Sequence, residues 1–332
     1  MKFAILFVIF LSGVSSLPNV EEELHAHWRN YKSIHEKSYE TDEEEQMRKD
    51  LWHANRKFID NHNKLYEAGV VTYTLAQNHL SDRTEEELRS LRNFKGNSKT
   101  LPGKVHTLSG NKIPESIDWR TVGGINPIRD QSECGACWTF SAVASLEFQY
   151  WNMTKSLISL SEEQLLSCME GKSCKSGGVM SEAYDYLKTH KLQTRDSYPY
   201  TTSSQKCCYD EEKGVLAGVD SYVSIPEGCE DLLTDAVAHH GVISVAMNSL
   251  EPSFVNYSGG IYAPNTTLCD PKGIDHGIAI VGYGTDAKDG DFYWVRNSWG
   301  TKWGMGGYFK IARNRNNTCG IATLASYPII KN

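Results

Sequence analysis

Nine cysteines, all of them after residue 130, constrain how this chain can fold more than any other feature of its sequence. They occupy positions 134, 137, 168, 174, 207, 208, 229, 269 and 319. An odd number leaves at least one thiol outside any set of intramolecular disulfides, and we expect that thiol to be Cys137. The later part of the chain is therefore expected to be crosslinked, whereas the part before residue 130 has no cysteine to crosslink.

The chain begins with Met1 and Lys2, followed by an apolar run over residues 3–11 and small residues up to Ser16. This run is too short to span a bilayer and predicts a secretory signal peptide over residues 1–16, with a signal anchor as the alternative. A secretory route permits disulfides and predicts a lysosomal or extracellular location. It would also expose four glycan acceptor patterns, at Asn152, Asn256, Asn265 and Asn316.

Residues 17–112 are rich in charged residues and show helical periodicity, which predicts a separate small helical module. A polar stretch over residues 95–112 predicts an extended, cleavable linker, so that a second domain covers residues 113–332. The net charge of -7 provides no basic footprint for nucleic acid. No segment after the first run is apolar enough to span a membrane.

Within residues 113–332 the pattern changes from helix to strand. The sequence predicts helices over 137–151, 161–166, 181–190 and 230–240, with Gly241 as the last helix's C-cap. Strands are predicted over 242–247, 277–283, 292–296 and 307–312. Helices followed by a sheet indicate an α+β body of two lobes, and ligands prefer the cleft between such lobes.

Three short motifs carry the chemistry: Cys134-Gly-Ala-Cys137-Trp138, Asp275-His276-Gly277 and Asn297-Ser298-Trp299. Cys137 would begin a helix, where the dipole and the free N–H groups lower a thiol pKa. His276 would take its proton, and the Asn297 carboxamide would orient the imidazole. Gln131 would supply an N–H to an oxyanion hole.

Other interpretations of the same residues remain open at this point. Cys134 and Cys137 could form a redox-active dithiol. Cys134, Cys137, Cys168 and Cys174 could bind zinc. The chain could also be a catalytically idle binding protein, although none of the four candidate catalytic residues is replaced. We favour peptide hydrolysis and expect neither a metal nor a cofactor.

With these motifs, the chain resembles the papain-family cysteine peptidase precursors, in particular their cathepsin L-like members. Spaced prosegment residues support the resemblance, namely Glu44, Arg48, Trp52, Asn55, Ile59 and Asn63, then Ala76, Asn78, Leu80 and Asp82. It implies a two-lobed papain-like fold, with a helical left lobe and a β-barrel-like right lobe, preceded by a small helical inhibitory prodomain. Peptide and protein substrates, the chain's own propeptide and cystatin-like inhibitors are the implied partners.

The resemblance also places the substrate cleft. Gly178 would pair with the substrate backbone, and Trp299 would cover His276 and Asn297. The pocket for the second residue before the cut (P2) would be lined by Val179, Met180, Ala246, Ile274, Gly277 and Leu324. With no carboxylate at its base, such a pocket should prefer Leu, Val or Phe over Arg.

The disulfides that the resemblance implies are Cys134–Cys174, Cys168–Cys207 and Cys269–Cys319. A fourth bridge, between Cys208 and Cys229, is our hypothesis. Exopeptidases of this family block one end of the cleft, and residues 209–229 contain no long insertion, so an endopeptidase is expected. Seven of the 11 histidines precede residue 113, and we predict that acid loosens the prosegment.

Overall fold

The computed structural model describes residues 20–96, 104–202 and 206–331. The expected signal peptide over residues 1–16 lies outside these ranges. The chain divides into two compact units, residues 1–49 and 50–332. In the first unit, α1 (Val20–His35) precedes the start of α2 (Asp42–Glu67). There the indole of Trp28 stacks on Tyr31 and donates a hydrogen bond to Glu45 at 3.0 Å.

The second unit begins with the residues after Lys49 that belong to the expected prosegment. They include the rest of α2, β1 (Tyr73–Leu75), α3 (Glu85–Ser90) and β2 (Lys104–Val105). The Asn63 carboxamide bonds both the N–H and the carbonyl of Leu75, each at 2.9 Å. Thr84 and Glu87 form a capping box that begins α3. Polar side chains therefore hold these prosegment elements in place, in a part of the chain that contains no cysteine.

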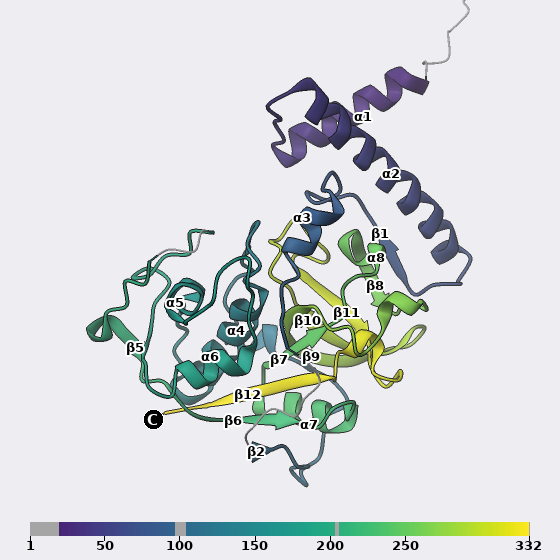
Figure 1. The fold of residues 1–332 in the computed structure, drawn as a ribbon. Coiled ribbons are helices and arrows are strands. Elements are labelled where there is room, and N and C mark those ends of the chain that lie inside the picture. Colours follow the sequence, from purple (N-terminus) through teal and green to yellow (C-terminus); the bar gives the residue numbers. More distant parts are fainter. Residues whose placement is uncertain (1–19, 97–103, 203–205, 332) are drawn as a thin grey trace, which may run out of the picture. The chain divides into compact units, whose positions relative to one another are not determined.

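The helical lobe consists of α4 (Cys137–Thr154), α5 (Glu162–Cys168) and α6 (Met180–Tyr186), with the short pair β4 (Leu192–Gln193) and β5 (Gly214–Leu216). Figure 1 shows the three helices together, with β5 at the outer edge of the lobe. Residues 137–148 of α4 are all buried, as its continuous apolar sequence predicts. Hydroxyls fix α4 to the sheet, because Ser141 donates to the Ile278 carbonyl at 2.6 Å and Ser145 to that of Val242 at 2.7 Å.

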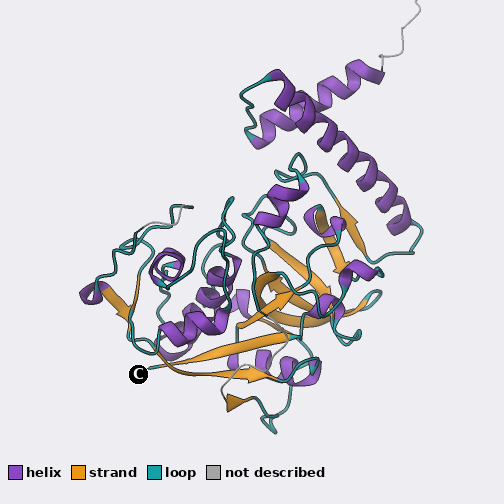
Figure 2. Ribbon diagram, in the orientation of Figure 1, coloured by secondary structure: helices purple, strands orange, loops and turns teal. Residues whose placement is uncertain are grey.

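The other lobe is a sheet of ten described strands, in the order β1-β8-β11-β10-β9-β7-β12-β6-β2, with β3 paired to β9. Figure 2 shows most of these strands grouped beside the helical lobe, with β12 extending from the sheet towards it. The bounds are β3 (Ile117–Asp118), β6 (Val219–Ile225), β7 (Ile243–Met247), β8 (Tyr257–Tyr262), β9 (His276–Asp286), β10 (Gly290–Arg296), β11 (Tyr308–Ala312) and β12 (Leu324–Ile330). Two further helices, α7 (Glu230–His240) and α8 (Pro252–Val255), and 3-10 turns at 119–122, 211–213, 267–269 and 318–320 complete this unit.

The predicted fold class, an α+β papain-like body after a helical prosegment, is confirmed. One helix ends earlier than predicted, and several strands, among them β1, β6, β8 and β12, were not predicted. The helix expected over 181–190 ends at Tyr186. The next carbonyl, that of Leu187, accepts the N–H of Val219 at 2.9 Å and so bonds to the first residue of β6 instead of continuing the helix. The sequence also gave no signal for β12, which contains Pro328. At Pro328 this strand pairs with β6 alone, so the missing N–H of proline breaks no ladder.

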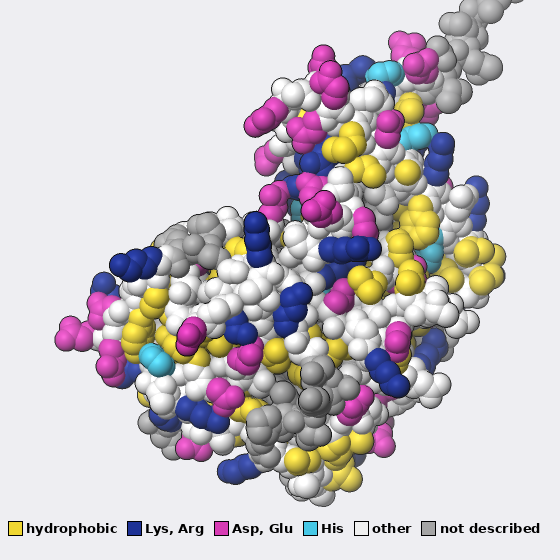
Figure 3. Space-filling view, viewed as in Figure 1, with side chains coloured by type: hydrophobic (Ala, Val, Ile, Leu, Met, Phe, Trp, Pro, Cys, Tyr) yellow, Lys and Arg dark blue, Asp and Glu magenta, His cyan; other side chains and the backbone are white. Residues whose placement is uncertain are grey.

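No described helix combines the length and the apolar character that a membrane span requires. Figure 3 shows acidic and basic side chains interspersed over the visible face, without a large field of one sign.

Candidate active site

Cys137 is the first residue of α4, and its thiol is free and buried. Burial raises the pKa of this thiol to about 11, although backbone hydrogen bonds from Gly277 and Asn93 act in the opposite direction. The sequence alone predicted a lowered pKa at this helix start. Loss of hydration is the larger effect and outweighs these hydrogen bonds, so the thiol is held protonated.

His276 begins β9, and Asn297 follows the end of the neighbouring strand β10. The Nε2 atom of His276 lies 2.8 Å from Oδ1 of Asn297, and the same Oδ1 accepts the backbone N–H of Ser298 at 2.8 Å. Because a carboxamide oxygen only accepts, Nε2 carries the proton. Nδ1, which has no hydrogen-bond partner among the described residues, is then able to accept a proton.

The imidazole of His276 is neutral in this state. Burial lowers its pKa to about 4, the bond to Asn297 opposes this shift, and the guanidinium of Arg92 adds to it. The Trp299 ring lies over the imidazole, with 4.9 Å between ring centroids, as expected for a side chain that covers this pair. A thiol and a neutral imidazole are therefore present here, and a thiolate–imidazolium ion pair is disfavoured.

Gly277 allows β9 to approach the start of α4. A Cβ atom at Gly277 would lie 3.1 Å from Cα of Trp138 and 3.3 Å from the carbonyl carbon of Cys137. Such contacts are tighter than most Cβ atoms make, so a side chain at this position would require the start of α4 to shift by a few tenths of an ångström. Gly277 thus permits this close approach of the two backbones.

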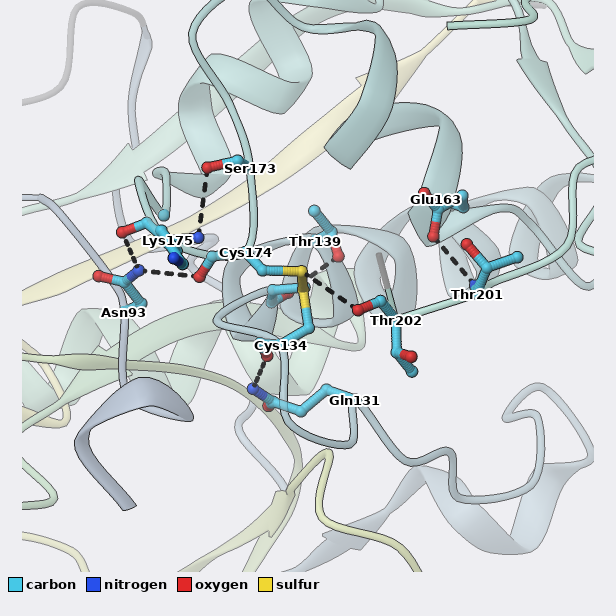
Figure 4. The surroundings of a disulfide bond; sticks show 12 residues. Asn93, Gln131, Cys134, Thr139, Glu163, Ser173, Cys174, Lys175, Thr201 and Thr202 are labelled. Atoms are coloured by element: carbon cyan, nitrogen blue, oxygen red, sulfur yellow. Dashed lines mark hydrogen bonds between the residues drawn. A yellow bond between two sulfur atoms is a disulfide. The ribbon is translucent and has the colours of Figure 1, made fainter. Parts of the chain in front are cut away.

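Gln131 is fully buried below the same cleft. Its Nε2 donates to the carbonyls of Leu91 at 2.9 Å and Cys134 at 2.8 Å, and its Oε1 accepts from the hydroxyl of Ser298 at 2.5 Å. Figure 4 shows the bond to the Cys134 carbonyl. Leu91 belongs to the prosegment. Its carbonyl oxygen therefore accepts a hydrogen bond from the Gln131 side-chain N–H that was expected to bind an oxyanion.

The prosegment crosses the cleft over residues 91–95. The Phe94 N–H donates to the Asp275 carbonyl at 2.9 Å, and the Lys95 N–H to that of Gly178 at 3.2 Å. Asn93 donates from its side chain to the carbonyls of Cys174 and Lys175, as Figure 4 shows. Gly178, which was expected to pair with substrate backbone, forms a parallel bridge with Phe94.

Phe94 is buried in an apolar cluster of the cleft region. The cluster includes the predicted P2-pocket residues Met180, Ala246, Ile274 and Leu324, with Val179 packed against it, and it also includes Cys137 and Trp138. The structure therefore brings these five predicted residues into the same apolar cluster as a prosegment aromatic side chain. The sequence analysis missed Phe94, because residues 91–96 have no periodicity that would indicate a role.

Three disulfides join Cys134 to Cys174, Cys168 to Cys207 and Cys269 to Cys319, the pairs that the family resemblance implies. Because Cys134 is bonded to Cys174, it is not available to form a redox-active dithiol with Cys137. The four-cysteine zinc site likewise loses the thiolates of Cys134 and Cys174. Among residues 20–96, 104–202 and 206–331, no group of three His, Cys, Asp or Glu side chains is placed to hold a metal.

The hypothesis of a fourth bridge is wrong, because Cys208 and Cys229 are free. The Cys208 N–H donates to the Tyr198 hydroxyl in the helical lobe. Cys229 instead precedes α7, beside Gly228, whose N–H donates to the Ala322 carbonyl of the sheet lobe. The two thiols are thus anchored to different lobes.

One of the four predicted glycosylation sites, Asn256, is buried in the structure. Its side chain is only 1% exposed, with Nδ2 donating to Asn55 Oδ1 at 3.2 Å and Oδ1 accepting from Ser81 at 2.9 Å. A glycan would attach at this same Nδ2, so the folded precursor has no room for it. Asn152, Asn265 and Asn316 are exposed.

We therefore expect the folded precursor to carry no glycan at Asn256. Glycopeptide mapping of the precursor secreted by a eukaryotic host checks this, with the exposed Asn152, Asn265 and Asn316 as internal comparisons. Quantitative occupancy of Asn256 in a precursor that remains inhibited would contradict this placement of the prosegment.

A free cysteine at a helix start, an imidazole–carboxamide pair and a cleft filled by the chain's own prosegment define a class, the cysteine endopeptidase precursors. Comparison with known families agrees: residues 113–329 match the papain family cysteine proteases, and residues 28–88 match the cathepsin propeptide inhibitor domain. The chain belongs to the papain family of cysteine proteases.

Its relatives span nearly its whole length. Procathepsin L of Rattus norvegicus is 41% identical and covers 98% of both chains, and digestive cysteine proteinase 2 of Homarus americanus is 38% identical over 99% of this chain and 100% of its own. Among solved structures, the digestive procathepsin L2 proteinase of Tenebrio molitor superimposes with a TM-score of 0.84 at 34% identity, covering 92% of this chain and 99% of that one.

Proposed function

We propose that this cathepsin L-like zymogen hydrolyses peptide bonds through Cys137 and His276, with a preference for apolar side chains at P2. One observation carries the proposal: Phe94 lies in the apolar pocket beside a free Cys137, while the imidazole of His276 is held by Asn297. The prosegment thus occupies the position where a substrate would bind, and its departure would free every group that the reaction needs.

In the proposed reaction, His276 takes the proton of Cys137 and the thiolate attacks the peptide carbonyl carbon. The carbonyl electron pair moves to oxygen, where the side-chain N–H of Gln131 and the backbone N–H of Cys137 stabilise it. His276 then gives its proton to the leaving amine as the C–N bond breaks. Water, deprotonated by His276, attacks the thioester and releases the acid and the thiol.

The P2 preference follows from the composition of the pocket around Phe94. Its five clustered lining residues are aliphatic, alanine or methionine, with no carboxylate among them. A buried guanidinium would lose its hydration there and gain no partner, whereas Phe, Leu or Val would gain apolar contact. Arg at P2 should therefore be rejected.

We further propose that residues 1–16 are removed as a signal peptide and that residues 17–112 are cleaved from a mature domain of residues 113–332. A lysosomal or extracellular location fits this route and the three disulfides. The cleft that the prosegment vacates is the surface that cystatin-like inhibitors would block.

The decisive experiment is acid treatment of the purified precursor, followed by hydrolysis of Phe-Arg and Arg-Arg dipeptidyl reporters. We expect the Phe-Arg reporter to be cleaved at least about tenfold faster. A thiol-directed epoxide should abolish both activities and modify Cys137. Equal hydrolysis of the two reporters would reject the apolar pocket, and activity that resists the epoxide would reject the thiol.

Buried histidines should also make the precursor acid-sensitive. His62 of the prosegment bonds the Tyr73 carbonyl at 3.0 Å, and burial lowers its pKa, although this bond and the carboxylate of Glu251 act in the opposite direction. A histidine whose pKa is lowered by docking binds fewer protons when docked. Docking is then stable above the ordinary value of 6.5 and weakens as the pH falls below it.

Replacing His62 by glutamine keeps a donor for the Tyr73 carbonyl and removes the titration. We expect His62→Gln to slow self-activation at pH 5 by roughly threefold, with little change at pH 4, where other buried groups titrate. Timed electrophoresis of the precursor across pH 4–7 measures this, with the exposed His27→Gln as control. Identical pH profiles for the two variants would remove His62 from the switch.

A further inference from the structure

A hollow of about 480 Å³ lies between the prosegment and the mature domain. The prosegment contributes Arg83 and Leu91 to its wall, and the mature domain contributes Asp130, Glu133 and Trp299. This space belongs to the same cleft, but the P2 pocket and the proposed reaction do not use it.

The hollow lies where the leaving group of a substrate would be. Phe94 marks the P2 pocket, and the Leu91 carbonyl bonds to Gln131, so prosegment residues before Leu91 continue beyond the reaction centre. Trp299, in the wall of the hollow, covers the imidazole of His276, which would protonate the leaving amine. The wall therefore faces the first residues after the cut.

The charges on this wall have one sign. Among the described residues of the mature domain that line the hollow, two are carboxylates, Asp130 and Glu133, and none is a cation. The Asp130 carboxylate accepts the Ser132 N–H at 2.7 Å, which fixes it at the wall. The Glu133 side chain is 73% exposed, so it is able to turn towards a substrate once the prosegment has left.

The prosegment itself places a cation in this hollow. Nη1 of Arg83 lies 2.7 Å from Oε1 of Glu133 and 3.1 Å from Oε1 of Glu87, its neighbour one helical turn away. Arg83 and Glu87 leave together with the prosegment, whereas Glu133 stays behind. Removal of the prosegment thus uncovers a carboxylate that has been occupied by a guanidinium.

We propose that Glu133, with Asp130 beside it, makes the mature enzyme select a basic side chain at the first or second residue after the cut. This inference rests on the proposed function and names the substrate class of the same site: peptides that combine an apolar P2 residue with Arg or Lys on the leaving-group side. In the precursor, the guanidinium of Arg83 pairs with Glu133 in the way proposed for a basic side chain of the substrate.

The test uses acid-activated enzyme and internally quenched peptides that share Phe-Arg before the cut and carry Arg, Gln or Glu at either of the two following positions. We expect kcat/KM for the Arg peptide to exceed that for the Glu peptide by about tenfold at low salt. The Arg side chain would form an exposed ion pair with Glu133, whereas the Glu side chain would be repelled by it. This ratio should fall towards about twofold in Glu133→Gln and, through screening, in about 0.5 M salt.

Two further variants keep the test sharp. Glu133→Lys should reverse the ratio, a result that general damage to the enzyme would not produce. Glu212→Gln, which removes an exposed carboxylate of the 3-10 turn at 211–213, should keep the ratio of the unaltered enzyme. An unaltered ratio in Glu133→Gln overturns this inference and leaves the proposed function standing, whereas failure to cut any peptide overturns the proposed function and this inference with it.

Discussion

Replacing Cys137 by alanine is expected to lower kcat/KM for a Phe-Arg reporter by on the order of 10⁴-fold, because the proposed reaction then has no nucleophile. The same precursor should remain uncleaved in acid, although active enzyme added in trans should process it. The buried thiol makes few polar contacts, so alanine should leave the fold intact, which circular dichroism and thermal unfolding would verify.

The free cysteines supply the matched control for this variant. Cys137, Cys208 and Cys229 are the thiols outside the three disulfides, and Cys208 is exposed. We expect the Cys208→Ala variant to keep full activity. Its Cys137 should still react with the epoxide. Comparable loss of activity in both variants would show that the assay reports folding or disulfide pairing, and it would contradict a unique role for Cys137.

Replacing Phe94 by alanine should release the active site without acid. Phe94 is 4% exposed, and truncating a buried phenylalanine typically costs about 3–5 kcal/mol, or on the order of 10²–10⁴-fold in the docking equilibrium. The variant precursor should therefore hydrolyse the Phe-Arg reporter at pH 7, where the unaltered precursor is inert. Activity would be measured within minutes of mixing, before self-cleavage contributes.

Phe58 provides the comparison within the same prosegment. Its side chain on α2 is 37% exposed, so Phe58→Ala removes the same number of atoms from a position with less packing. This variant should stay inhibited at neutral pH. If Phe94→Ala were equally inert, filling of the pocket would not contribute to inhibition, and the hydrogen bonds of the prosegment backbone would have to account for it.

Local patterns in the sequence were sufficient for much of the fold. The continuous apolar run after Cys137 predicted a helix buried on every side, and Ser161 predicted the start of α5, where its hydroxyl accepts the Gln164 N–H at 3.0 Å. Short apolar runs bounded by turn residues located β7, β9, β10 and β11 to within a few residues. These elements were predictable because each is a local run of apolar residues, and β7 and most of β9 are buried along their length.

Long-range contacts account for the features that were missed or wrong. The bridge expected between Cys208 and Cys229 fails because each cysteine is held by a different lobe. Asn256 matches a glycan acceptor pattern, yet its carboxamide is covered by Asn55 and Ser81, which lie about 200 and 175 residues earlier in the chain. Neither outcome is encoded in the residues adjacent to these sites.

The sequence by itself determined the chemical groups of this protein, its helical prosegment and the nature of its α+β body, because side-chain chemistry and the order of apolar and polar residues are local properties. Only the tertiary structure decided the state of those groups. By placing Asn93, Phe94 and Leu91 in the cleft, the fold removes water from Cys137 and His276, and lost hydration keeps the thiol protonated and the imidazole neutral.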